Sequence, residues 1–314
     1  MKIQQLRYLS EVARRDLSVS AAAEALFTSQ PGISRQIKAL EDELGIEIFV
    51  RHGKRLTALT EPGRAVLAIA ERILAEAANL KRAGEEFANE KLGSLTIATT
   101  HTQARYALPK AVAAFKRRYP DVQLVIHQGN PTQICEMVLR GEAEFAIATE
   151  QIAQYPELVS LPCYQWNRCV VVPAGHPLAK VKPLTLEAVA RYPIVTYDFA
   201  FANRSLVEKA FEQRGLKPKV VLTALDADVI KTYVELGLGV GIMAAMAFNA
   251  KRDQGLKALD ASHLFESSTT RLGIKRGAYL RRYAYDFIEQ FAPNLTRALV
   301  EKTVMDKAGT SYEL

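Results

Sequence analysis

Few residues in this 314-residue chain have the types and spacing that catalysis needs. The five histidines form no HExxH motif, and no GxSxG sequence presents a serine nucleophile. Asp226 and Asp228 suggest a metal site or a general base, but capping of a helix explains both of them better. We therefore expect no enzyme, and neither a catalytic residue, a metal site nor a cofactor.

A run of polar residues, TTHTQ at positions 99–103, lies where an expected strand ends and an expected helix begins. Such a junction presents free backbone N–H groups and the positive end of a helix dipole. Hydroxyls and an amide there make an anion site without a cation. Thr149 ends the expected strand AEFAIAT, so its hydroxyl should face the same crevice. The alternative is that these side chains only cap helices.

Trp166 is the only tryptophan in the chain. Its indole N–H can donate a hydrogen bond into a cleft while the ring forms a wall. Packing in a hydrophobic core is the alternative.

Residues 19–38 predict a helix-turn-helix, because two short amphipathic patterns meet at a tight join. Ser18 can cap the first helix. The apolar face of the second helix comprises Ile33, Ile37, Leu40 and Leu44, and Pro31, Arg35 and Lys38 lie on the opposite face.

The start of the second helix offers short hydrogen-bonding side chains and a guanidinium to a DNA major groove. Arg35 suits a guanine edge or a phosphate, and Lys38 a phosphate. The segment that follows, IEIFVRHGKRLTALTEPG, predicts a two-stranded basic wing. The expected DNA-binding residues are Thr28, Ser29, Gln30, Pro31, Ser34, Arg35, Lys38, Arg51, Lys54 and Arg55.

A long helical stretch follows from residue 61 to residue 89. Its apolar residues recur every three or four positions, as in a helix that pairs with a partner helix: Val66, Ile69, Ile73, Ala77 and Leu80. We expect a dimerisation helix, and packing of the same residues against their own domain is the alternative.

From residue 93 the chain alternates between apolar strands and helical segments in two sets, which predicts an α/β domain with two lobes and a cleft between them. The expected boundaries are 1–59 for the winged helix-turn-helix, 60–92 for the linker, 93–300 for the two-lobed domain and 301–314 for a polar tail. Lobe I takes about 93–163 and 268–300, and lobe II about 164–267.

Composition limits the class of protein without naming it. The formal net charge is +7, but residues 1–92 carry 14 Lys and Arg against 13 Asp and Glu, so only +1 lies there.

The cysteines and the apolar segments indicate the cellular compartment. Cys135, Cys163 and Cys169 contain no CxxC pair and should be buried, reduced thiols. No apolar run spans a bilayer and no signal segment is visible, so we expect a cytoplasmic protein without membrane contact.

The segment LSVSAAAEALFTSQPGISRQIKALEDELGIEIFVRHGKRLTALTEPG resembles the N-terminal domain of LysR-type transcriptional regulators. ATTHTQARYALP, HQGNPTQI, EFAIATE, LPCYQWNR and ALDADVIKTYVELGLGVG are similar to the CysB-like branch, which controls sulfate assimilation and cysteine synthesis. The resemblance implies an effector domain like a periplasmic binding protein. It also implies an activator that binds promoter double-stranded DNA as a homotetramer, a dimer of dimers, with RNA polymerase as a further partner.

The resemblance further implies an effector in the cleft, either a sulfate- or thiosulfate-like anion or N-acetylserine or O-acetylserine. The matching positions are Thr100, Thr102, Gln103, Thr149 and Trp166. Ala202 stands where the branch usually has a threonine, so Asn203, Ser205 or water replaces that hydroxyl, or the anion binds about 1 kcal/mol less tightly.

Two other functions remain open on the sequence. A paralogous regulator of sulfonate or alkanesulfonate utilisation would share the same segments. An anion-binding protein of the periplasmic type would share the two lobes, but the DNA-reading pattern and the lack of a signal segment argue against it.

Overall fold

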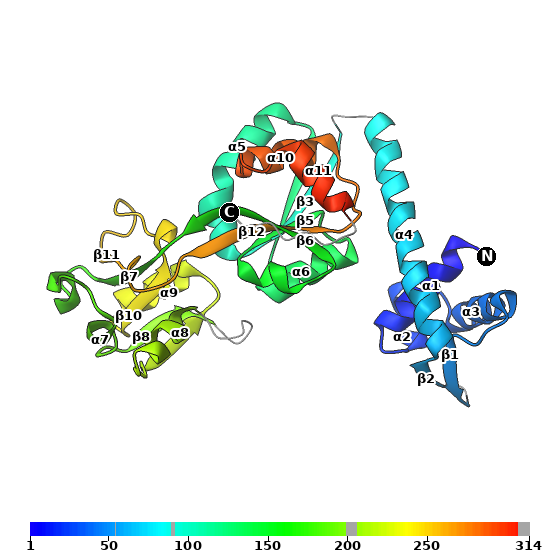
Figure 1. Ribbon diagram of the computed structural model, residues 1–314, viewed down its shortest axis with the longest axis horizontal. Helices are drawn as coiled ribbons and strands as arrows, with labels where there is room; N and C mark the ends of the chain where they lie inside the picture. Colours follow the sequence, from blue (N-terminus) through cyan, green and yellow to red (C-terminus); the bar gives the residue numbers. More distant parts are fainter. Residues whose placement is uncertain (54, 89–91, 199–205, 307–314) are drawn as a thin grey trace. The chain divides into compact units, whose positions relative to one another are not determined.

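The computed structural model describes residues 1–53, 55–88, 92–198 and 206–306. The chain divides into two compact units, Met1–Ala88 and Asn89–Leu314 (Figure 1). Among the described residues, no helix is both long and apolar enough to cross a membrane.

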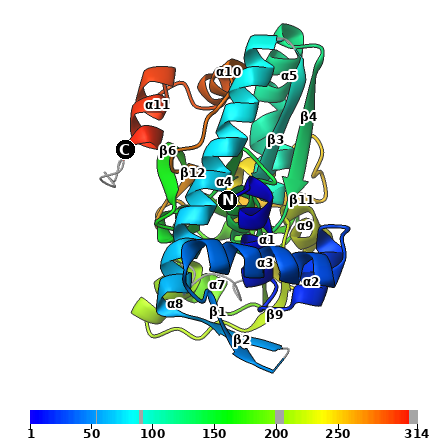
Figure 2. The ribbon, with the colours of Figure 1, turned by 90° about the vertical axis from the view of Figure 1, so that its right-hand side faces the viewer.

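The first unit is a helix-turn-helix with a two-stranded hairpin and a long final helix. Its elements are α1 (Ile3–Arg14), α2 (Val19–Ala25), α3 (Gln30–Leu44), β1 (Phe49–His52), β2 (Arg55–Leu59) and α4 (Glu61–Ala88). The hydroxyl of Ser18 caps α2 and that of Ser29 caps α3, as side chains of this type do when they accept the free N–H groups of a first turn. Figure 2 shows the β1–β2 hairpin extending away from the helices.

The buried face of α3 is shorter than the sequence pattern predicts. Ile33, Ile37 and Leu40 are buried in the core of the unit, but Leu44 is 40% exposed. The helix ends at Leu44 because Gly45 adopts a left-handed conformation (φ 67°), which glycine tolerates best. The prediction of Leu44 as a core residue is therefore wrong.

The apolar positions of α4 divide into two groups. Val66 and Ile73 pack against the core of their own unit, so for these two the packing alternative holds. Ile69 is 47% exposed and Leu80 is 76% exposed. The outer group is the part of the helix that is available to a second chain.

Lobe I of the second unit is built on a five-stranded sheet of order β4-β3-β5-β12-β6. Strand β3 is parallel to both β4 and β5, and β12 is antiparallel to both of its neighbours. The elements are β3 (Gly93–Thr99), the π-helical turn η1 (Gln103–Ala107), α5 (Leu108–Arg118), β4 (Val122–Gln128), α6 (Pro131–Arg140), β5 (Phe145–Ala148), η2 (Glu150–Gln154), β6 (Leu158–Trp166), β12 (Ser268–Lys275), α10 (Arg282–Phe291) and α11 (Arg297–Met305).

Lobe II is built on a second five-stranded sheet, of order β11-β7-β10-β8-β9. Its elements are β7 (Arg168–Pro173), η3 (Pro177–Lys180), α7 (Leu186–Val189), β8 (Ile194–Tyr197), α8 (Leu206–Gln213), β9 (Val220–Ala224), α9 (Ala227–Glu235), β10 (Val240–Ala244), η4 (Ala245–Ala247) and β11 (Leu256–Asp260). The two mixed α/β lobes after a helix-turn-helix and a linker helix confirm the predicted fold class.

Two details differ from the sequence expectation. Strand β11 was not predicted, because its residues LKALD are short and mixed in polarity. The expected polar tail begins at residue 301, whereas α11 continues to Met305 and buries Val304 against the core of lobe I.

The three cysteines are free thiols buried in the lobes, as predicted. Burial raises the pKa of Cys135, Cys163 and Cys169 to about 12, because the thiolate is poorly solvated there.

Candidate functional site

The start of α3 places the predicted DNA-binding side chains on the surface. Ser29, Gln30 and Pro31 are exposed, and so is Arg35, whose Nε donates to the carbonyl oxygen of Pro31 at 3.3 Å. Lys38 lies one turn further on and pairs with Asp42 at 3.0 Å. The hydrogen bond to Asp42 raises the pKa of Lys38. Arg35 is therefore the less committed of the two cations.

The basic wing is only partly available to a phosphate. Arg55 is exposed, and Lys54 lies outside the described residues. Arg51 instead donates from Nη2 to Oε2 of Glu41 at 2.7 Å, and Glu41 is buried. Glu41 therefore binds the wing to α3.

The predicted ligand residues of lobe I lie at the carboxyl ends of neighbouring strands. Thr100 directly follows β3 and Thr149 directly follows β5, and these two strands are parallel neighbours. Thr102 and Thr149 each occupy an N-cap position, but neither side chain makes a capping hydrogen bond. Neither threonine therefore caps a helix with its side chain.

Gln103 is buried and mostly committed to the protein itself. Its Nε2 donates to Oγ1 of Thr270 at 3.0 Å, and its Oε1 accepts from the hydroxyl of Tyr164. An amide has two N–H donors, so one of them remains for a ligand.

Trp166 ends β6 beside Arg168, the first residue of β7. The Arg168 guanidinium lies 5.1 Å from the centre of the indole ring, and its Nη2 donates to Ser268 Oγ at 2.9 Å. Burial lowers the pKa of Arg168. Nε1 of Trp166 is buried and has no hydrogen-bond partner among the described residues. No cation was expected here from the sequence, and the half-buried Arg168 places one beside the indole.

Tyr197 joins this group from lobe II. Its hydroxyl lies 3.5 Å from Oγ1 of Thr102 and accepts from the backbone N–H of Ala244 at 3.3 Å. Burial raises the pKa of Tyr197. Sequence reasoning missed Tyr197 and Arg168, although Arg168 stands in the quoted segment LPCYQWNR. Asn203, the remaining predicted ligand residue, and Ala202 lie outside the described residues.

A hollow of about 480 Å³ lies beside this group, between the start of the helical segment in lobe I and the start of α9 in lobe II. It contains none of the predicted ligand residues. Its lining is His101, Arg105, Asp226, Asp228, Val229, Thr232, Tyr233 and Leu236.

The two aspartates of this hollow have different roles. Asp226 caps α9, accepting from the N–H of Val229 at 2.8 Å, as predicted. Asp228 does not act as a cap. It pairs with Arg105 at 2.6 Å and Lys231 at 3.1 Å, and accepts from the Tyr106 hydroxyl at 2.8 Å. The contacts with Arg105 and Tyr106 join the two lobes.

The chain matches two protein families along most of its length. Residues 3–64 match the family described as bacterial regulatory helix-turn-helix protein, lysR family. Residues 88–296 match the LysR substrate binding domain. The DNA-reading surface lies in the first match and the group around Trp166 in the second.

Named relatives are similar over nearly the whole chain. The HTH-type transcriptional regulator CysB of Burkholderia cenocepacia is 56% identical over 314 residues, which is 100% of both chains. The regulator SsuR of the same organism is 56% identical over 298 residues, 95% of this chain and 97% of the relative. The crystal structure of the cofactor-binding domain of the Cbl transcriptional regulator is 42% identical, with a TM-score of 0.67, and covers 70% of this chain and 96% of that one. The chain therefore belongs to the LysR family of transcriptional regulators, in the branch of CysB, SsuR and Cbl.

Proposed function

We propose that this regulator controls genes of sulfur assimilation and cysteine biosynthesis, and that a sulfate-like anion or an acetylated serine in its cleft sets its activity. The observation that carries the proposal is the buried indole N–H of Trp166, which has no partner among the described residues. An indole nitrogen can only donate, and a buried donor without an acceptor costs about 1–3 kcal/mol, so an oxygen of a bound ligand is the natural acceptor.

The surrounding side chains supply what such a ligand needs. Hydrogen-bond donors for the oxygen atoms of a ligand lie at the carboxyl ends of the strands. They are the hydroxyls of Thr100, Thr102 and Thr149 and one N–H of Gln103. Arg168 adds positive charge beside the indole. Asn203 completes the proposed set.

Titration of the full chain tests this proposal. Sulfate, thiosulfate, N-acetylserine and O-acetylserine are added separately while Trp166 emission and heat of binding are recorded. We expect at least one of the four to bind with a change in emission. Thr102→Val, which keeps the shape but removes the hydroxyl, should weaken that ligand about tenfold, as the loss of roughly 1.4 kcal/mol implies.

Two results would contradict the anion cleft. One is the absence of binding by all four ligands. The other is binding that leaves Trp166 emission flat and is unaffected by Thr102→Val. Thr223→Val, an exposed threonine of β9, is the matched control and should bind as the original chain does.

Two sets of genes are candidates for the targets of this regulator. The name of the CysB relative supports cysteine biosynthesis, but the chain is 56% identical to SsuR as well. A paralogous regulator of sulfonate or alkanesulfonate utilisation is therefore the second candidate. Mapping the promoters that the regulator occupies in cells separates the two, because occupancy confined to sulfonate-utilisation genes would replace the cysteine assignment.

We also propose that α4 pairs two chains through its outer apolar residues, so that two copies of α3 read two half-sites. Ile69 and Leu80 are exposed apolar residues of that face. Leu80→Glu should shift the sedimentation of the full chain toward a smaller species, whereas Ala78→Glu, about 160° away around the helix, should not. Equal sedimentation of the two variants would remove this interface.

Assembly as a dimer of dimers, contact with RNA polymerase and activation of transcription complete the proposed role. A ligand can change DNA binding only if it prefers one arrangement of the subunits. Footprinting with and without N-acetylserine tests that coupling, since an unchanged footprint and an unchanged DNA bend would show that the ligand does not act through the operator complex.

A further inference from the structure

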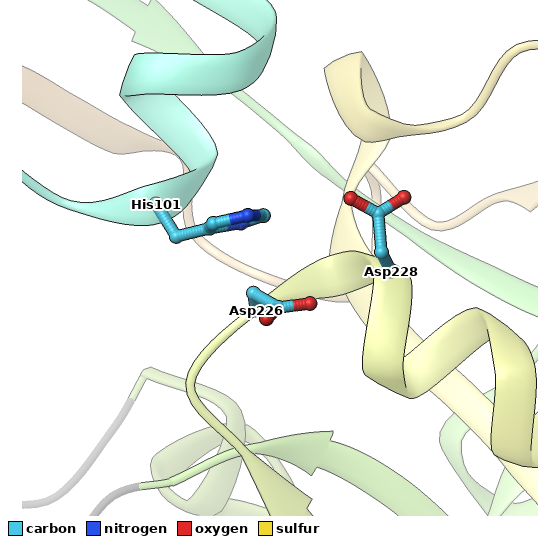
Figure 3. Close-up of side chains that lie close together, drawn as sticks. All are labelled: His101, Asp226 and Asp228. Carbon is cyan, nitrogen blue, oxygen red and sulfur yellow. The ribbon is translucent and has the colours of Figure 1, made fainter. Parts of the chain in front are cut away.

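Three side chains that belong to no part of the proposed anion site meet at the hollow between the lobes. His101 comes from the start of the helical segment in lobe I, and Asp226 and Asp228 come from the start of α9 in lobe II. One ligand atom of each lies within 4.8 Å of the others. Figure 3 shows the imidazole ring extending toward the two carboxylates.

The buried ring nitrogen of His101 has no hydrogen-bond partner among the described residues. This nitrogen, Nδ1, is inaccessible to solvent. A buried ring nitrogen of this kind costs free energy unless an acceptor, a donor or a metal ion meets it. The structure places the carboxylates of Asp226 and Asp228 in one cluster with this imidazole.

The carboxylates are held by further contacts, as metal ligands usually are. Oδ1 of Asp226 accepts from the N–H of Val229 at 2.8 Å. Oδ1 of Asp228 accepts from the Tyr106 hydroxyl at 2.8 Å and lies 3.1 Å from Nζ of Lys231. Each aspartate thus has its Oδ1 atom held by a donor of the protein.

One cation competes for this position. Arg105 Nε lies 2.6 Å from Oδ2 of Asp228, and its side chain is 50% exposed. A metal ion that binds this oxygen must displace Arg105, which can turn into solvent at small cost because the ion pair is already half hydrated.

We propose that His101, Asp226 and Asp228 form a divalent transition-metal site that bridges the two lobes, with Zn²⁺ as the best-fitting ion. One imidazole and two carboxylates are a nitrogen and oxygen ligand set that zinc accepts, with a fourth position open to solvent. Ligands about 2.0–2.1 Å from zinc stand about 3.4 Å apart in a tetrahedron. The present separation of up to 4.8 Å therefore requires the side chains or the lobes to approach each other, so the ion would favour closure.

The test uses the full chain after treatment with a chelator. Zn²⁺ is titrated by calorimetry, and Co²⁺ is added as a spectroscopic probe of the same position. We expect one strong site per chain in the original protein. His101→Gln and Asp226→Asn should each weaken Zn²⁺ binding at least tenfold. Asparagine caps helices about as well as aspartate, so Asp226→Asn removes the charge and leaves the helix start intact.

Matched controls separate this site from adventitious binding. His127→Gln and Asp121→Asn change an exposed histidine and an exposed aspartate of lobe I and should leave the strong site unchanged. Arg105→Gln should tighten Zn²⁺ binding, because it removes the competing cation from Asp228.

Two results would overturn the metal site. One is an original chain that shows no strong Zn²⁺ site after treatment with a chelator. The other is a strong site that persists unchanged in both His101→Gln and Asp226→Asn. Neither result depends on sulfate or acetylserine, so the metal site and the proposed anion cleft can fail separately.

Discussion

Arg51 and Glu41 bind the wing to the recognition helix. Nη2 of Arg51 donates to Oε2 of Glu41 at 2.7 Å, while Oε1 of the same carboxylate accepts from the N–H groups of Ile48 at 2.9 Å and Phe49 at 3.3 Å. One buried carboxylate therefore satisfies three donors and sets where β1 begins. An arginine expected to contact DNA acts first as a structural residue.

Replacing Glu41 with Gln should loosen the start of the wing. The charge-assisted hydrogen bonds of the Glu41 carboxylate are lost, and the NH₂ group of the new glutamine faces groups that are themselves donors. We expect the free energy of unfolding to fall by about 2–3 kcal/mol. Hydrogen exchange at Ile48 and Phe49 in the full chain measures this directly and should be faster. Glu47→Gln, at an exposed position nearby, is the control. Unchanged exchange in Glu41→Gln would show that the carboxylate does not hold the wing.

Two glycines of α4 should respond oppositely to alanine. A Cβ at Gly63 would collide with the backbone carbonyl of Ile48 and lie 2.9 Å from Thr60 Oγ1, whereas a Cβ at Gly84 meets nothing within 4 Å. Gly63→Ala should destabilise the first unit by at least about 2 kcal/mol, as overpacking does. Gly84→Ala should stabilise the helix by about 0.5–1 kcal/mol. Loss of helical circular dichroism in urea measures both, and equal midpoints for the two variants would refute the proposed clash.

Arg168 should matter for ligand binding through Trp166. Arg168→Met removes the charge and the hydrogen bond to Ser268 while it keeps much of the volume. We expect sulfate affinity to fall about tenfold, or roughly 1.4 kcal/mol, with an altered Trp166 emission maximum. Arg168→Lys should restore little, since lysine has no planar fork to stack on the indole. Full recovery by lysine would indicate that only the charge counts.

The three cysteines predict a pH dependence of stability. Burial raises the pKa of each thiol from its ordinary value of 9.0 to about 12. Between these values the unfolded chain has released protons that the folded chain keeps, so the free energy of unfolding falls as pH rises. Below pH 9 this contribution is fully present. Urea midpoints at pH 8 and pH 10 should differ less in a variant with all three cysteines replaced by alanine, and an equal difference would contradict the effect.

Local rules predicted the elements better than the site. Ser18 caps its helix as expected, because a cap depends on residues within one turn. The contact of Arg168 with Trp166 and the pairing of Asp228 with Arg105 were not predicted. The first requires the path of two strands at the lobe junction, and the second joins residues 123 positions apart in different lobes. No periodicity in the sequence encodes either one.

The order of strands in lobe I has a consequence for how the protein is made. Strand β6 is an edge strand whose neighbour is β12, and β12 follows all of lobe II in the chain. A ribosome therefore releases β6 and then every strand of the second sheet before the partner of β6 exists. Lobe II can complete its sheet during synthesis, while lobe I waits with an unpaired strand until residues 268–275 emerge. A nascent chain arrested before that point would expose the edge of β6 to whatever chaperone or neighbouring chain is at hand.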